Sequence, residues 1–82
     1  MPYIPMKDRQ FAAADPQTPG ELNYALTRLL LQYIENTPLR GYQALNDCLG
    51  ALAGAQAEFY RRVVVPFEDR KKVVNGEVYS TP

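Results

Sequence analysis

Thr18-Pro19-Gly20-Glu21-Leu22 fixes the start of the first long helix in this chain of 82 residues. Threonine is a favoured N-cap residue, proline fits the first helical position, and Glu21 is placed to return a hydrogen bond to the Thr18 amide. Asn36-Thr37-Pro38 ends the helix, because the residue before a proline is displaced from helical backbone angles. We therefore expect a helix over about 19–35.

Apolar residues cover a wide arc of this first helix. At 100° per residue they span about half of the circumference, which is more than an ordinary surface helix buries. They are Leu22, Ala25, Leu26, Leu29, Leu30, Tyr33 and Ile34. Tyr24 and Leu31 lie together on the opposite side, with Arg28 one turn from both. Two separate faces of this helix therefore need contacts.

A second helix is expected over about 40–65, where Pro66 either stops or kinks it. One of its faces carries four small residues at the spacing i, i+3, i+4 and i+7. These residues, which we call the seam, are Gly50, Ala53, Gly54 and Ala57. The two glycines each cost about 0.8–1 kcal/mol relative to alanine, so we expect close packing to compensate. The seam has two possible packing partners: the first helix of the same chain, or a helix of a second subunit.

After Pro66 two structures compete. The stretch Val73-Val74-Asn75-Gly76-Glu77-Val78 is typical of a hairpin with an Asn-Gly turn. The order of the charges favours a short third helix, with acidic residues in its first turn, basic residues later and Asn75-Gly76 at its C-terminal cap. We choose the helix.

These elements predict an all-α fold in a single domain, residues 1–82. Its body, residues 18–75, is an antiparallel helical hairpin followed by the short third helix. Residues 1–19 hold four of the seven prolines, and residues 1–17 are expected to form an extended arm. Residues 76–82 are expected to form an extended tail.

The composition excludes much catalytic chemistry. The chain has no histidine and a single cysteine, Cys48, which removes histidine-based triads, histidine-ligated metals, CxxC redox motifs and internal disulfides. Cys48 lies in an apolar stripe, where burial makes a thiol inert.

Nine basic residues balance nine acidic ones, which gives no general attraction to long nucleic acids or membranes. With no signal peptide and no spanning segment in sight, we expect a cytoplasmic, non-catalytic protein without cofactor or metal.

Arginine and tyrosine recur side by side in this sequence. Such pairs stack on a base and grip a phosphate bidentately, which lysine does less well. The pairs are Tyr24 with Arg28, Arg40 with Tyr42, and Tyr60 with Arg61 and Arg62. The alternative is that Arg61 and Arg62 extend to solvent or pair with Glu58 and Asp69.

Four blocks of the sequence resemble a family of small bacterial and phage proteins of unknown function. The blocks, which together cover nearly the whole chain, are Met1-Pro2-Tyr3-Ile4, then Gly20-Glu21-Leu22-Asn23-Tyr24 with Thr27-Arg28-Leu29, then Tyr60-Arg61-Arg62-Val63-Val64 with Pro66-Phe67-Glu68-Asp69, and Asn75-Gly76-Glu77-Val78-Tyr79. This resemblance implies no activity. In size and helical make-up the chain is also similar, in fold type only, to phage sponge proteins that sequester cyclic-nucleotide immune signals. No defining motif of those sponges is matched here.

We expect a homo-oligomer, because two helices do not bury three apolar faces within one chain. The seam or the face of Leu31 is then placed between subunits.

The functional hypothesis is that the oligomer binds, and sequesters, a small anionic signal of the cyclic or phosphorylated nucleotide type, as a phage counter-defence protein. The candidate ligand-binding residues are Tyr24, Arg28, Tyr60, Arg61 and Arg62. The alternative is a structural or protein-interaction module without a small-molecule ligand, whose arginines and tyrosines form subunit contacts.

Overall fold

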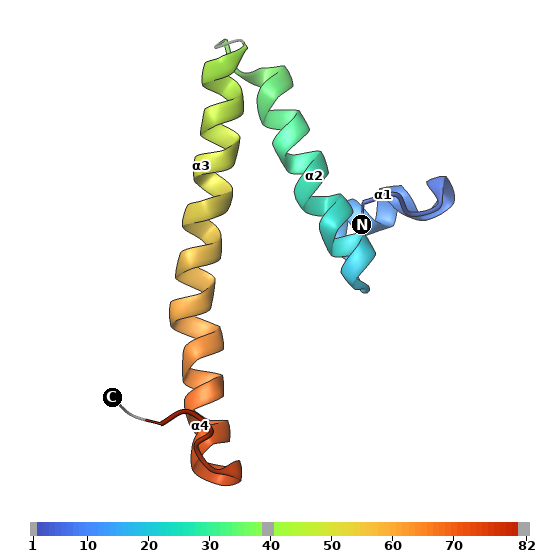
Figure 1. Ribbon diagram of the computed structural model, residues 1–82. Coiled ribbons are helices and arrows are strands. Elements are labelled where there is room, and N and C mark those ends of the chain that lie inside the picture. Colours follow the sequence, from blue (N-terminus) through green and yellow to red (C-terminus); the bar gives the residue numbers. More distant parts are fainter. Residues whose placement is uncertain (1, 39–40, 81–82) are drawn as a thin grey trace. The chain divides into compact units, whose positions relative to one another are not determined.

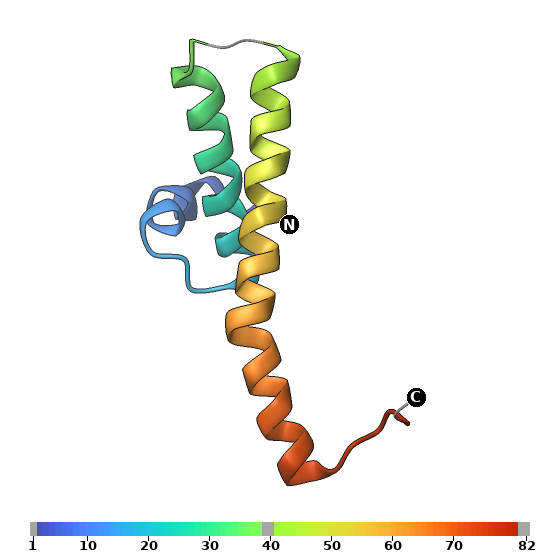
Figure 2. The ribbon, with the colours of Figure 1, turned by 90° about the vertical axis from the view of Figure 1, so that its left-hand side faces the viewer.

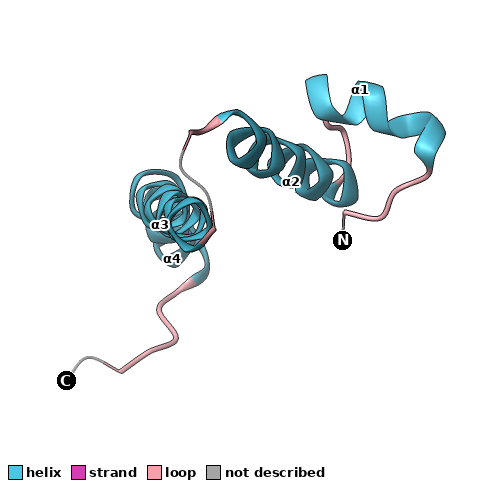
Figure 3. Ribbon diagram, turned by 90° about the horizontal axis from the view of Figure 1, so that it is seen from above, coloured by secondary structure: helices cyan, strands magenta, loops and turns pink. Residues whose placement is uncertain are grey.

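The computed structural model describes residues 2–38 and 41–80, which form helices joined by loops, with no strand among them (Figures 1 and 3). The elements are a 3-10 turn at Met6–Asp8, α1 at Arg9–Ala14, α2 at Pro19–Asn36, α3 at Tyr42–Phe59, a π-helical turn at Tyr60–Val64 and α4 at Val65–Asn75. The predicted all-α class is confirmed for the described residues. The chain divides into two compact units, Met1–Cys48 and Leu49–Pro82.

The expectation of an extended arm over residues 1–17 is wrong for its middle part. Residues 2–5 form neither helix nor strand, with the Ile4 amide donating to the Pro2 carbonyl at 3.0 Å, and the 3-10 turn and α1 occupy Met6–Ala14. The three prolines of the arm, Pro2, Pro5 and Pro16, stand near its two ends, and the proline-free stretch between them is rich in alanine and other good helix formers. Ala12 of α1 is 1% exposed, and α1 packs against α2.

The capping signals of α2 place its ends as predicted. The Thr18 hydroxyl accepts a hydrogen bond from the Glu21 amide at 3.1 Å. The Glu21 carboxylate accepts from the Gln17 amide at 2.8 Å, one residue earlier than the expected Thr18 amide. At the other end Asn36 is the last helical residue, and the Thr37 amide donates to the Tyr33 carbonyl.

Within the first unit, two contacts join α2 to the start of α3. The Tyr33 hydroxyl donates to the Asp47 carboxylate at 2.6 Å, and the Cys48 sulfur lies 3.8 Å from the Leu30 carbonyl oxygen. Residues 39 and 40 lie outside the described part of the chain.

The second unit keeps a helical backbone through Pro66, where a stop or a kink was expected. Proline lacks the N–H that an α-helix needs, and its ring collides with the carbonyl four residues earlier, here that of Arg62. The chain responds with the π-helical turn, in which the Val65 amide donates to the Tyr60 carbonyl five residues back. The helix predicted over 40–65 is therefore observed as α3 and this turn, and α4 begins at Val65.

The stretch after Pro66 is helical, so the hairpin alternative is wrong. Asn75 is the last residue of α4, and Gly76 follows it with a φ of +96°, a backbone angle that favours glycine. The Gly76 amide donates to the Lys72 carbonyl at 2.8 Å and closes the helix end. Beyond it, residues 77–80 form the non-helical tail that Figure 2 shows leaving α4.

The core is small. Among the described residues the buried apolar side chains are Ala12, Ala44 and Cys48, each of them small. None of the helices in the described residues has the length and hydropathy to cross a membrane.

Candidate functional site

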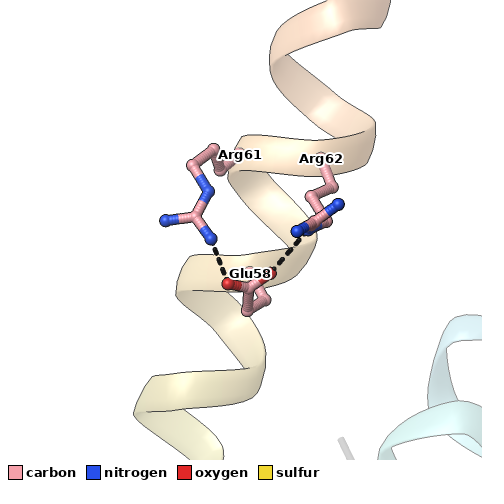
Figure 4. Close-up of polar contacts among 3 residues, drawn as sticks. All are labelled: Glu58, Arg61 and Arg62. Atoms are coloured by element: carbon pink, nitrogen blue, oxygen red, sulfur yellow. Dashed lines mark hydrogen bonds and ion pairs between the residues drawn. The ribbon is translucent and has the colours of Figure 1, made fainter.

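Arg61 and Arg62 both bind the carboxylate of Glu58, as Figure 4 shows. The Arg62 Nε atom lies 2.9 Å from one carboxylate oxygen, and the Arg61 Nη2 atom contacts the other oxygen. The spacings of three and four residues place the arginines one turn beyond the glutamate. The structure therefore brings these two predicted residues together, with Glu58 between them.

This cluster of Glu58, Arg61 and Arg62 is open to solvent. The two arginine side chains are 67% and 75% exposed. Ion pairs at such positions contribute about 0–1 kcal/mol, and a guanidinium has five N–H donors. Most of those donors remain for another acceptor, and the cluster carries one net positive charge. A phosphate or carboxylate group would therefore displace or join Glu58 at a small energetic cost.

Tyr60 lies beside an open groove of about 590 Å³ between α4 and the tail. The charges along this groove disfavour an anion, because Glu68, Asp69 and Glu77 outnumber Lys71 and Lys72. The rest of its lining is Val65, Asn75, Gly76, Val78 and Tyr79.

Lys72 in this groove is already paired. Its ammonium lies 3.3 Å from an Asp69 oxygen and 3.6 Å from a Glu77 oxygen, and the bond to Asp69 raises the pKa of Lys72. The Glu77 carboxylate also accepts the amides of Tyr79 and Val78 at 3.0 and 2.9 Å, and the bond from Tyr79 is the main reason why the pKa of Glu77 is lowered. Lys72 and Glu77 of this groove are therefore already satisfied by contacts within the second unit.

Tyr24 and Arg28 do not form the predicted pair. The ring of Tyr24 is covered instead by the guanidinium of Arg9, 5.7 Å from its centroid, and Arg9 also donates to the Ile4 carbonyl at 3.1 Å. Arg28 is half-buried and makes no ion pair with any carboxylate of the described residues. Arg40, predicted to pair with Tyr42, lies outside the described residues.

Sequence reasoning missed the role of Arg9. That contact depends on the packing of α1 on α2, within a segment predicted to be extended, so no local spacing in the sequence marked it.

The seam is open. A Cβ atom added at Gly50 or at Gly54 would meet no heavy atom within 4 Å. The alanines of the seam, Ala53 and Ala57, are exposed too. Leu31, the other predicted interface residue, is 42% exposed.

Asp47 and Cys48, two further side chains of α3, make contacts of their own. Asp47 accepts from Tyr33 and, at 2.9 Å, from the Gln43 side chain. Cys48 is buried, as predicted. Within residues 2–38 and 41–80, no group of three or more Cys, Asp or Glu side chains is placed to hold a metal ion.

A comparison with known proteins assigns the chain to a protein family. The model of the domain of unknown function DUF6899 matches residues 1–78 of the chain. No curated protein and no solved structure matches significantly.

Proposed function

The chain belongs to the DUF6899 family, and from its own residues we propose that it is a non-catalytic helical module that works by associating with itself. The supporting observation is the mismatch between its apolar content and its core. Three small side chains are buried in the described part, whereas large apolar ones stay exposed on every long helix. Leu29 of α2, Leu49 of α3 and Val74 of α4 are 64%, 65% and 77% exposed.

The exposed apolar side chains occur in both units of the chain, with Leu29 in the first and Leu49 and Val74 in the second. Contact between copies is the simplest way to remove such a surface from water.

Light scattering of the purified chain tests this proposal. At micromolar concentration we expect a mass of at least two chains. A stable mass of 9.3 kDa, with helical circular dichroism showing a folded protein, would refute self-association.

A second candidate function is the binding of a small anionic nucleotide-type ligand. The observation that favours it is the carboxylate of Glu58 between the two guanidinium groups of Arg61 and Arg62, because a phosphate has the same donor requirements. The adjacent Tyr60 is 55% exposed and offers a ring for stacking on a base.

A thermal-shift screen with cyclic di- and trinucleotides and ADP-ribose derivatives tests this candidate. A ligand at 100 times its dissociation constant stabilises the fold by about 2.7 kcal/mol. Glu58→Gln removes the competing carboxylate and is expected to increase the shift, and Arg61→Ala with Arg62→Ala to abolish it. Arg70→Ala, which also removes one arginine from the second unit, is the matched control. No shift with any compound would leave the interaction module as the sole proposal.

A further inference from the structure

We propose that a second copy of the chain docks in parallel on an apolar stripe of the second unit, with Arg62 of each copy beside the partner's Glu68. This inference rests on the proposed self-association and names its surface and its direction. It is carried by the spacing of the stripe across the π-helical turn, by its length and by the charges on its two flanks. The stripe consists of Leu52, Phe59, Phe67 and Val74, all within Leu49–Pro82.

The π-helical turn keeps the stripe on one side of the helix. Its four members are between 37% and 77% exposed and are seven, eight and seven residues apart. The interval of eight, from Phe59 to Phe67, spans the turn Tyr60–Val64. Because a π turn takes up one residue more than an α-helical turn, this interval also counts as seven. Apolar residues that repeat every seven positions are typical of a helix that packs along a partner helix.

The helices of the first unit do not reach the far half of the stripe, whatever the angle between the two units. Cys48 contacts Leu30, and α2 extends only eleven residues from Leu30 to its start at Pro19, about 17 Å. Phe67 is nineteen residues beyond Cys48, about 28 Å along the helix. The other helix, α1, has six residues and packs on α2. A second copy, in contrast, brings a stripe of the same length and spacing.

Opposite charges flank the stripe. Arg62, three residues after Phe59, lies on one flank. Arg70, three residues after Phe67, lies on the same flank. Glu68, one residue after Phe67, lies on the other flank.

These charges select the parallel direction. In a parallel pair each flank meets the opposite flank of the partner, so arginine meets glutamate, whereas in an antiparallel pair like flanks meet and arginine faces arginine. Arg62 precedes Glu68 by six residues, of which the π turn takes up one. The five that remain are the offset at which the flanks of two parallel helices in register meet.

One inward position of the repeat is charged. Lys71 follows Phe67 by four residues and precedes Val74 by three, and its amine lies 5.6 Å from the centroid of the Phe67 ring. A lysine at such a position lowers the stability of a helix pair but fixes its register. It therefore favours one alignment of the two copies over shifted ones.

Arg62 and Glu68 both have capacity for the contact. Arg62 binds Glu58 through its Nε atom, which leaves the two terminal nitrogens of the guanidinium as donors. Glu68 forms no ion pair with a basic residue in the part of the chain that the structure describes. The partner's Arg62 would supply one.

Exchange of charges in the full-length chain tests the pairing. Arg62→Glu and Glu68→Arg each place like charges together in a parallel pair, and each is expected to raise the dissociation constant of the oligomer about tenfold, measured by analytical ultracentrifugation. An equal mixture of the two variants restores both ion pairs and is expected to associate as the wild type does. Arg61→Glu is the matched control, because Arg61 binds the same Glu58 but lies about 200° around the helix from Phe59.

Disulfide trapping tests the direction. Every variant also carries Cys48→Ser, which removes the native thiol. Val74→Cys is expected to cross-link by itself, because parallel copies in register bring the two positions within disulfide distance across the stripe. Val73→Cys replaces a neighbouring exposed valine on another side of the helix and is the matched control.

The outcomes separate this inference from the proposed function. Stronger association of Arg62→Glu indicates antiparallel helices and overturns the inference. It is also overturned if the mixture associates no better than Arg62→Glu and Glu68→Arg do separately, or if Val74→Cys cross-links no more than Val73→Cys. In each of these cases an oligomer by light scattering leaves self-association standing. A folded monomer overturns both.

Discussion

The Thr18 hydroxyl stabilises the first turn of α2 by accepting the Glu21 amide, which otherwise lacks a partner within the helix. We expect Thr18→Ala to lower the free energy of unfolding by about 1 kcal/mol. Urea unfolding at one fixed protein concentration measures this loss. Thr27→Ala is the control, because the Thr27 hydroxyl donates to the Asn23 carbonyl inside the same helix, and we expect it to change stability by less than about 0.5 kcal/mol. Equal losses in the two variants would contradict the capping role.

The hydroxyl of Tyr33 is coupled to the charge of Asp47. The hydrogen bond to Asp47 is the main reason why the pKa of Tyr33 is raised above its ordinary value of 10.0. Because the folded pKa exceeds the unfolded one, the stabilisation is complete below about pH 10 and is lost as the pH rises through the folded pKa. We expect Asp47→Asn to lower the pKa of Tyr33 toward 10.0, measured by ultraviolet titration with Tyr33→Phe as the reference. Identical titration curves for the wild type and Asp47→Asn would contradict the coupling.

Local spacing decides which residue contacts the sequence predicts. Glu58 with Arg61 and Arg62 was foreseen as the alternative to ligand binding, because residues three and four apart meet on any helix. The contact between Arg9 and Tyr24 was not, because it joins two elements whose packing no local rule fixes.

Among the elements, the π-helical turn Tyr60–Val64 is the response of the helix to Pro66. We expect Pro66→Ala to restore an α-helical bond from the residue-66 amide to the Arg62 carbonyl and to remove the π turn. The variant should gain about 1–3 kcal/mol in free energy of unfolding, since a proline inside a helix costs about 3 kcal/mol and the π turn relieves part of that cost. Amide hydrogen exchange at residues 61–66 and urea unfolding measure both effects. Pro16→Ala, in the loop before α2, is the control, and an unchanged exchange pattern in Pro66→Ala would show that another residue causes the turn.

The elements were predictable where a terminus has its own chemical signal. Thr18, Pro19 and Pro38 set the ends of α2, and Gly76 sets the end of α4. The short helix α1 was missed because prolines near both ends of its segment masked a proline-free stretch of helix formers. The π turn was missed because a proline within a helical pattern admits several outcomes, and the choice depends on backbone strain that residue patterns do not reveal.

For the whole molecule, self-association links stability to concentration. If folded copies bind one another and unfolded chains do not, mass action raises the midpoint of unfolding as the protein concentration rises. We expect a higher thermal midpoint at a hundredfold higher concentration. If the seam lies between the copies, Gly54→Leu removes this dependence while the protein remains helical, because the added side chain meets open space in one copy and obstructs a second. The same dependence in Gly54→Leu would exclude the seam as the interface.

At this scale the sequence indicated that the chain has more apolar surface than two helices bury, and the small core agrees with that estimate. The sequence did not choose between the two predicted contact faces, the seam and the face of Leu31, because both carry residues suited to packing against another helix.

The π-helical turn also bears on the history of the chain. A π turn holds one residue more than the α-helical turn that it replaces, so a helix with such a turn accommodates an inserted residue without breaking. Relatives without a proline at position 66 should then be one residue shorter between the equivalents of Phe59 and Val65, with the residues on either side unchanged. Because the extra residue bulges outward and does not turn the helix further, the side chains of α4 in such relatives would keep their phase with respect to those of α3, and a shared mode of self-association would have the same faces of both helices at its disposal.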